Sequence, residues 1–191
     1  MNEFTITRLG HQGDGIAEGP LYAPLTLPGE VITAAQDGQK LGDIRILTPS
    51  PDRVAPPCRH FKSCGGCQLQ HASDSFVAGW KVDVVRTALA AQGLQTDLPP
   101  VLTSPAASRR RAAFSARRTK KSATVGFHAR GSDVIIDIPD CQLVHPDLRA
   151  ARPALAALTT LGASRKAELN ITVTRFDQGL DVAISGGKPL D

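Results

Sequence analysis

Three of the four cysteines in this chain lie within ten residues of one another, which limits how the surrounding segment can fold. Cys58, Cys64 and Cys67 form a C-x5-C-x2-C pattern, and Cys141 lies far along the chain. Four cysteines are too few to hold 191 residues together by disulfides. The clustering favours a soft metal centre, because thiolates bind zinc and iron–sulfur clusters.

The two metal chemistries differ in the ligand spacing that they favour. A structural zinc ion is usually held by two pairs of ligands, each pair close in sequence. Only Cys64 and Cys67 form such a pair here, so the pattern is more typical of a [4Fe–4S] cluster. Gly65 and Gly66 fit this hypothesis, since a segment without β-carbons can turn tightly and point amides towards a negatively charged cluster. Zinc, or no metal, is the alternative.

The formal net charge of +4 is unevenly distributed. Residues 109–130 contain eight basic residues and no acidic residue, whereas residues 1–57 contain four basic and seven acidic residues. Such a concentrated positive stretch is typical of a surface that binds a polyanion.

Short apolar segments and glycine-rich turns in the first fifty residues predict a small antiparallel β-barrel of the OB type. The expected strands cover residues 4–9, 21–23, 30–34 and 41–47. Asp37-Gly38 predicts a hairpin turn between the last two. Prolines between residues 49 and 57 stiffen the next segment, because proline fixes φ and donates no hydrogen bond. We place a domain boundary here, between residues 1–52 and residues 53–191.

The second region is expected to combine an antiparallel sheet with helices, which makes the chain α+β overall. A helix is predicted from Asp74 to Gln92, because an apolar stripe that includes Trp80 repeats at helical spacing, and Trp80 is expected in the core. A second helix is predicted at residues 146–161, where Pro153 must kink or restart it. The expected strands cover residues 110–117, 123–129, 133–138, 169–175 and 180–185.

The residues around the cysteines resemble a known family. The sequence CRHFKSCGGCQLQH over residues 58–71 is similar to the cluster signature of the RNA uridine-C5 methyltransferases, above all of the 23S rRNA branch. Further matches follow in the family's order at Arg109-Arg110-Arg111-Ala112, Val125-Gly126-Phe127 and residues 137–141. Residues 13–17 and 27–30 resemble the pattern of the TRAM barrel that this branch carries.

The resemblance implies a TRAM barrel over residues 1–52 and a central RNA-binding domain with a cluster loop over residues 53–191. It also implies that a [4Fe–4S] cluster is held by Cys58, Cys64, Cys67 and Cys141. Members of the family transfer a methyl group from S-adenosylmethionine to C5 of a uridine after a cysteine attacks C6. That cysteine and the methyl-donor site belong to a further domain that nothing in this sequence matches. We therefore expect no catalytic and no S-adenosylmethionine-binding residue in this chain.

We interpret the chain as the RNA-recognition half of a methyltransferase that acts on RNA, with 23S rRNA favoured, and we expect it to be inactive alone. A zinc-stabilised RNA-binding module and a free-standing iron–sulfur electron carrier are the alternatives. RNA contacts are expected from the basic stretch, while a solvated strand edge is the other interpretation of these charges. The basic residues are Arg109, Arg110, Arg111, Arg117, Arg118, Lys120, Lys121 and Arg130.

Aromatic and histidine side chains add weaker predictions. Phe61 and His128 are candidates for stacking on RNA bases, whereas Phe127 is expected in the core. His60 and His71 flank the cysteines and are minor alternatives as metal ligands. The sequence has no secretory signal pattern and no apolar run that could span a membrane, so we expect a cytoplasmic monomer.

Overall fold

A computed structural model describes residues 1–188, which form two compact units. Unit 1 comprises residues 1–56 and 68–103, and unit 2 comprises residues 57–67 and the chain from Ser104 onwards. The segment that carries Cys58, Cys64 and Cys67 therefore belongs to the same unit as Cys141. Every helix within residues 1–188 is too short or too polar to cross a lipid bilayer.

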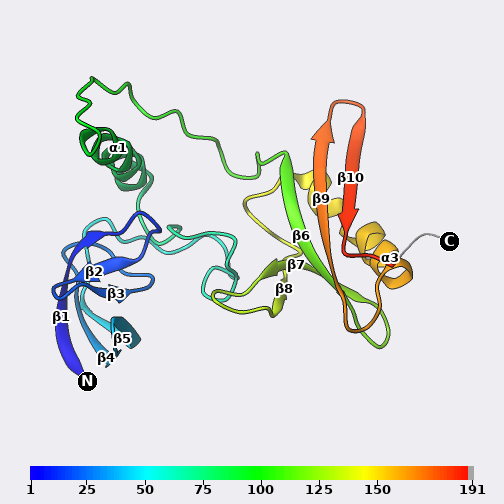
Figure 1. The fold of residues 1–191 in the computed structure, drawn as a ribbon, viewed down its shortest axis with the longest axis horizontal. Coiled ribbons are helices and arrows are strands. Elements are labelled where there is room, and N and C mark those ends of the chain that lie inside the picture. The colour runs from blue at the N-terminus through cyan, green and yellow to red at the C-terminus, as the bar shows by residue number, and fades with distance from the viewer. Residues whose placement is uncertain (189–191) are drawn as a thin grey trace. The chain divides into compact units, whose positions relative to one another are not determined.

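Unit 1 contains a closed barrel of five strands in the order β1-β2-β3-β5-β4 (Figure 1). The strands are β1 (Asn2–Leu9), β2 (Gly15–Ala17), β3 (Leu21–Ala23), β4 (Val31–Asp37) and β5 (Lys40–Thr48). Alternate side chains point inwards, and Ile6 and Ile32 are fully buried. The predicted small barrel is therefore confirmed.

The sequence analysis missed β2, because we interpreted its one glycine, Gly15, as part of a glycine-rich turn. Gly15 is in fact a strand residue that pairs with Leu9 and Ala23. A β-carbon at Gly15 would lie 2.0 Å from Thr26 Oγ1, so no larger residue fits at this point of the barrel. Gly15 therefore allows two barrel segments to pack closely and does not form a turn.

A buried ion pair ties the barrel to the proline-rich segment that follows it. Glu30 is fully buried and accepts hydrogen bonds from Leu27 N at 2.8 Å and Ser50 N at 3.2 Å. Its carboxylate also accepts from Arg53 Nε at 2.5 Å and Arg53 Nη2 at 2.9 Å. Burial alone raises the pKa of Glu30, but these hydrogen bonds and the charge of Arg53 outweigh burial and lower it.

Unit 1 also contains α1 (Asp74–Ala90). Ser73 caps its N-terminus by accepting a hydrogen bond from Phe76 N at 3.2 Å, and Gly93, with φ of 72°, follows its end. The prediction that Trp80 lies in the core is wrong, because no residue of α1 is buried and Trp80 is half-buried. Periodicity shows which side chains share a helix face, but it does not show what covers that face.

Unit 2 is built on an antiparallel sheet of five strands in the order β10-β9-β6-β7-β8 (Figure 1). The strands are β6 (Arg111–Arg118), β7 (Ala123–His128), β8 (Ile135–Asp137), β9 (Glu168–Phe176) and β10 (Gly179–Ser185). Two helices lie between β8 and β9, namely α2 (Pro146–Ala150) and α3 (Arg152–Gly162). They meet at Ala151, so the predicted restart of the helix near Pro153 is confirmed.

One face of this sheet forms the core of unit 2. Ala112, Phe114 and Ala116 alternate along β6 and are buried, and α3 packs on the sheet over β6 and β7. The ring of Phe127 stacks on Phe114 with centroids 5.3 Å apart, which confirms the core position predicted for Phe127. The α+β organisation predicted for the chain is therefore confirmed.

Candidate functional site

The cysteine segment is fastened to the end of β7 within unit 2. Gly65 N donates to His128 O at 2.8 Å, and Arg130 N donates to Ser63 O at 3.2 Å. Cys64 forms an antiparallel bridge with Ala129 between these two bonds. Residues 63–65 thus pair with residues 128–130 as a short ladder, and the sheet positions Cys64.

Polar contacts also connect the near cysteines to the remote one. His60 Nε2 lies 2.7 Å from Asp140 Oδ1, and Arg59 Nε lies 2.9 Å from Asp140 Oδ2. The hydrogen bond from His60 is the main cause that lowers the pKa of Asp140, with a smaller contribution from the charge of Arg59. Because Asp140 directly precedes Cys141, these contacts hold the two cysteine-bearing segments together.

The sulfur atoms lie in a partly buried environment. Cys64 and Cys141 are buried, Cys58 and Cys67 are half-buried, and none of the four forms a disulfide. Burial raises the pKa of the Cys64 thiol, Gly66 N–H lowers it, and the neighbouring Cys141 and Cys58 raise it further. The pKa of the Cys64 thiol is therefore affected by Cys141 and Cys58 as well as by burial.

Backbone amides and glycines complete this environment. Gly66 N donates to Cys64 Sγ at 3.4 Å, and Leu143 N donates to Cys141 Sγ at 3.4 Å. A β-carbon at Gly65 would lie 2.9 Å from His128 O, and one at Gly66 would lie 2.9 Å from the Phe127 ring. Hydrogen bonds to sulfur are characteristic of iron–sulfur sites. The four cysteine ligands, the amides that donate to their sulfur atoms, and Gly65 and Gly66 therefore fit such a group.

A single metal ion requires its ligands to lie close together. Within residues 1–188, no three His, Cys, Asp or Glu side chains are arranged to hold one metal ion. A tetrahedral zinc ion with Zn–S bonds of about 2.3 Å brings its sulfur ligands within about 3.8 Å of one another. A [4Fe–4S] cluster needs no such close group, because each cysteine binds a different iron atom.

The structure divides the eight basic residues into two groups. Arg110 lies 3.3 Å from Asp177, Arg117 lies 2.9 Å from Glu168, and Arg130 is bound to the cysteine segment. The other five form no ion pair in the part of the chain that the structure describes, and they are Arg109, Arg111, Arg118, Lys120 and Lys121. Arg117 and Arg118 follow one another on β6 and point to opposite faces, so not all eight can bind one ligand.

The two aromatic candidates for base stacking have different environments. Phe61 is only 3% exposed and lies beneath the guanidinium of Arg130, so the prediction that it stacks on bases is wrong. His128 is exposed at the end of β7, where its Nε2 lies 2.7 Å from Glu168 Oε1. The position of Phe61 in the sequence, close to the cysteines, did not indicate that its side chain is buried.

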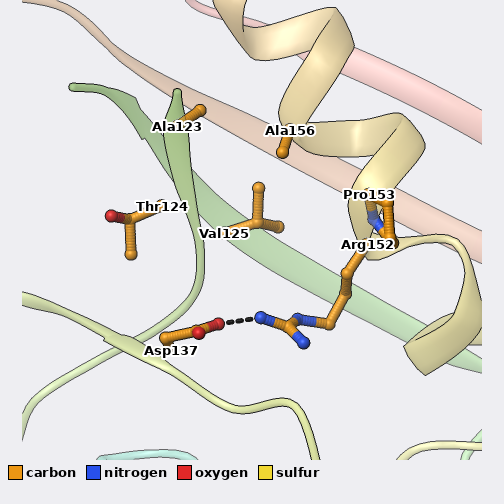
Figure 2. A pocket seen from close by; sticks show the side chains of 7 residues that line it. All are labelled: Ala123, Thr124, Val125, Asp137, Arg152, Pro153 and Ala156. Atoms are coloured by element: carbon orange, nitrogen blue, oxygen red, sulfur yellow. Dashed lines mark ion pairs between the residues drawn. The ribbon is translucent and has the colours of Figure 1, made fainter. Parts of the chain in front are cut away.

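A pocket between β7, β8 and α3 contains an ion pair that the sequence analysis did not find. Figure 2 shows the guanidinium of Arg152 facing the carboxylate of Asp137 across this pocket. Burial lowers the pKa of Arg152. The pair holds the end of β8, which leads to Cys141, against the start of α3. The lining residues are Ala123, Thr124, Val125, Asp137, Arg152, Pro153 and Ala156.

The chain is similar in sequence to proteins named as RNA methyltransferases. No family model matches it. An uncharacterized RNA methyltransferase of Caulobacter vibrioides is 43% identical over 193 residues, covering 97% of this chain and 46% of that protein. The 23S rRNA (uracil(1939)-C(5))-methyltransferase RlmD of Vibrio cholerae is 36% identical over 167 residues, covering 81% of this chain and 38% of that protein. The chain thus spans about half the length, or less, of these relatives.

A solved structure has the same fold. The tRNA (uracil-54, C5)-methyltransferase of Pyrococcus abyssi, in complex with S-adenosyl-L-homocysteine, superposes with a TM-score of 0.62 at 20% identity. The match covers 95% of this chain and 44% of that protein.

The chain is related to the RNA methyltransferases. The barrel, the sheet and the cysteine segment define this class of protein together with the relatives named above. Within this class, the predicted resemblance to the RNA uracil-C5 methyltransferase family is confirmed.

Proposed function

We propose that this chain is the RNA-recognition part of an S-adenosylmethionine-dependent RNA uracil-C5 methyltransferase whose substrate is 23S rRNA. The named activities of the relatives support the reaction class, and the Vibrio cholerae relative supports the rRNA substrate. The Pyrococcus abyssi enzyme, solved with S-adenosyl-L-homocysteine, supports a methyl donor of this kind for the whole protein. The methyl-donor site and the catalytic cysteine are proposed to lie outside residues 1–191.

The observation that carries this proposal is the gathering of the cysteine-bearing segments in unit 2. In our proposal Cys58, Cys64, Cys67 and Cys141 hold a [4Fe–4S] cluster. When bound, the cluster supplies a covalent cross-link between segment 57–67 and the segment around Cys141. The ladder between residues 63–65 and 128–130 and the contacts of Asp140 orient these segments for that role. The cluster is thus structural and shapes a surface for RNA.

The proposed RNA surface uses the basic residues that form no ion pair with the rest of the described chain. Lys120 and Lys121 lie in the turn between β6 and β7, and Arg111 begins β6 on the face opposite the buried Ala112. Phosphate groups attract such side chains without reading the base sequence, so they orient RNA rather than select a uridine. The barrel over residues 1–52 is proposed to be a TRAM domain, because it is small and closed and carries the TRAM-like residues 13–17 and 27–30.

Spectroscopy on the reconstituted protein tests the cluster. Anaerobic reconstitution with iron and sulfide should give a brown protein, and Cys141→Ser should bleach it, because the remote ligand is lost. Ser132→Ala, at an exposed position of the same unit, is the matched control and should stay brown. A colourless wild-type protein would contradict the proposal.

Binding experiments test the RNA substrate. A 23S rRNA fragment should bind more tightly than a tRNA transcript of equal length at the same salt concentration. Equal affinity for both would remove the support for rRNA, and failure to bind either RNA would contradict the recognition role. Reversible reduction of a cluster in a protein that binds no RNA would favour an electron carrier. Stoichiometric zinc in an RNA-binding protein would favour the zinc module.

A further inference from the structure

Arg130 differs from the other basic residues because its side chain is bound to the cysteine segment. Its Nη2 donates to the carbonyl oxygens of Cys67 and, at 3.5 Å, of Phe61. One guanidinium therefore connects two backbone positions on either side of Cys64. The same segment is already fastened by Arg130 N, which donates to Ser63 O.

A second contact fixes the guanidinium itself. Its Cζ lies 5.0 Å from the centroid of the Phe61 ring, which is within the range of a cation–π interaction. Phe61 is 3% exposed and Arg130 is half-buried, so this contact is shielded from solvent. The planar guanidinium lies over the Phe61 ring while its Nη2 donates to two carbonyls, and an ammonium group has no planar face for the first contact.

The charge of Arg130 lies beside the cysteine segment. The hydrogen bond from its Nη2 to Cys67 O places the guanidinium next to a proposed cluster ligand. A [4Fe–4S] cluster with four thiolates carries net negative charge, and nearby charge and hydrogen bonds set its stability and reduction potential. A positive group held beside the segment would therefore offset the negative charge of a bound cluster and raise its reduction potential.

We propose that Arg130 is a positioning residue for the cluster, which clamps segment 61–67 and offsets the negative charge of the metal centre, rather than an RNA contact. This inference rests on the proposed cluster for its electrostatic part. The clamping part concerns the protein without metal, because every contact named above exists between protein atoms alone.

Three variants separate the clamp from the charge. Arg130→Gln removes the charge and the planar guanidinium. Arg130→Lys keeps the charge but loses the planar group over Phe61. Arg149→Gln removes a half-buried arginine elsewhere in unit 2 and is the control. Loss of cluster absorbance in excess EDTA under nitrogen should be about 10- to 100-fold faster in Arg130→Gln, if the usual 10- to 100-fold loss of metal affinity without an outer-sphere partner appears in the dissociation rate. Arg130→Lys should fall between it and wild type, and Arg149→Gln should match wild type.

The reduction potential and hydrogen exchange complete the test. The potential should become more negative in Arg130→Gln and stay near the wild-type value in Arg130→Lys, which a purely structural role would not explain. In the metal-free protein, amides 63–67 should exchange faster in both variants of Arg130 than in Arg149→Gln. Equal EDTA rates and equal exchange in Arg130→Gln and wild type would overturn the inference. If wild type takes up no cluster, the proposed metal centre fails, while the exchange comparison still decides whether Arg130 clamps the segment.

Discussion

Replacing Glu30 by glutamine tests the buried ion pair that ties the barrel to the proline-rich segment after β5. Glu30 is fully buried and accepts four hydrogen bonds, from Leu27 N, Ser50 N and two nitrogens of Arg53. A glutamine in its place has one acceptor oxygen and turns an N–H₂ group towards another donor. It also leaves Arg53, which is mostly buried, without a counter-charge.

Removing one partner of a buried ion pair costs about 3–5 kcal/mol. Since each 1.36 kcal/mol changes an equilibrium constant about tenfold, Glu30→Gln should lower the amide protection of the barrel by roughly 10²- to 10⁴-fold. Hydrogen exchange of β1 and β4 measures this, with Glu18→Gln, an exposed change in the same unit, as the control. Unchanged protection in Glu30→Gln would refute the reasoning.

The same ion pair predicts a pH dependence with a defined sign. The pKa of Glu30 in the folded protein is held below its ordinary value of 4.5. Its stabilisation is therefore complete above about pH 4.5 and is lost as the pH falls through the folded-state pKa. The difference in protection between wild type and Glu30→Gln should be constant near neutral pH and should shrink in acid. A difference that grows in acid would show that another group controls the barrel.

Two further predictions concern unit 2. Gly126→Ala should separate β7 from β8 and lower the melting temperature, because the added β-carbon would lie 1.8 Å from Ile136 O. Wild-type hydrogen-exchange protection of the β7–β8 amides in this variant would contradict the prediction. The double variant Arg109→Gln with Arg111→Gln should weaken RNA binding. The slope of the logarithm of the binding constant against the logarithm of the salt concentration should fall in magnitude by about 1.4, which corresponds to two lost phosphate contacts on single-stranded RNA. Lys166→Gln, at an exposed position outside the basic stretch, is its control, and an equal slope in the double variant would assign both arginines to a solvated surface.

The sequence predicted elements well where the pattern is local. β6 and β7 begin and end within one or two residues of the expected strands, because alternating side chains and the turn at residues 119–122 determine them. The break between α2 and α3 followed from Pro153 alone. By contrast, β2 was missed because a glycine that is required by packing against Thr26 looks the same in sequence as a glycine in a turn.

Tertiary placement limited what the sequence could predict about the site. The cysteine spacing identified the candidate ligands, because three of them share one short segment. The environment of Arg130 depends on residues 128–130 pairing with residues 63–65, and no local pattern encodes a contact between positions so far apart. Charge alone therefore placed Arg130 among the RNA contacts. The exposure of α1 was missed for the related reason that burial depends on what packs against a helix.

The content of iron and acid-labile sulfide in the anaerobically purified protein tests the central claim most directly. About four iron and about four sulfide per chain are expected, as the cluster type requires. One zinc per chain with no sulfide, or four thiols that all react freely with an alkylating reagent, would contradict the proposed metal centre.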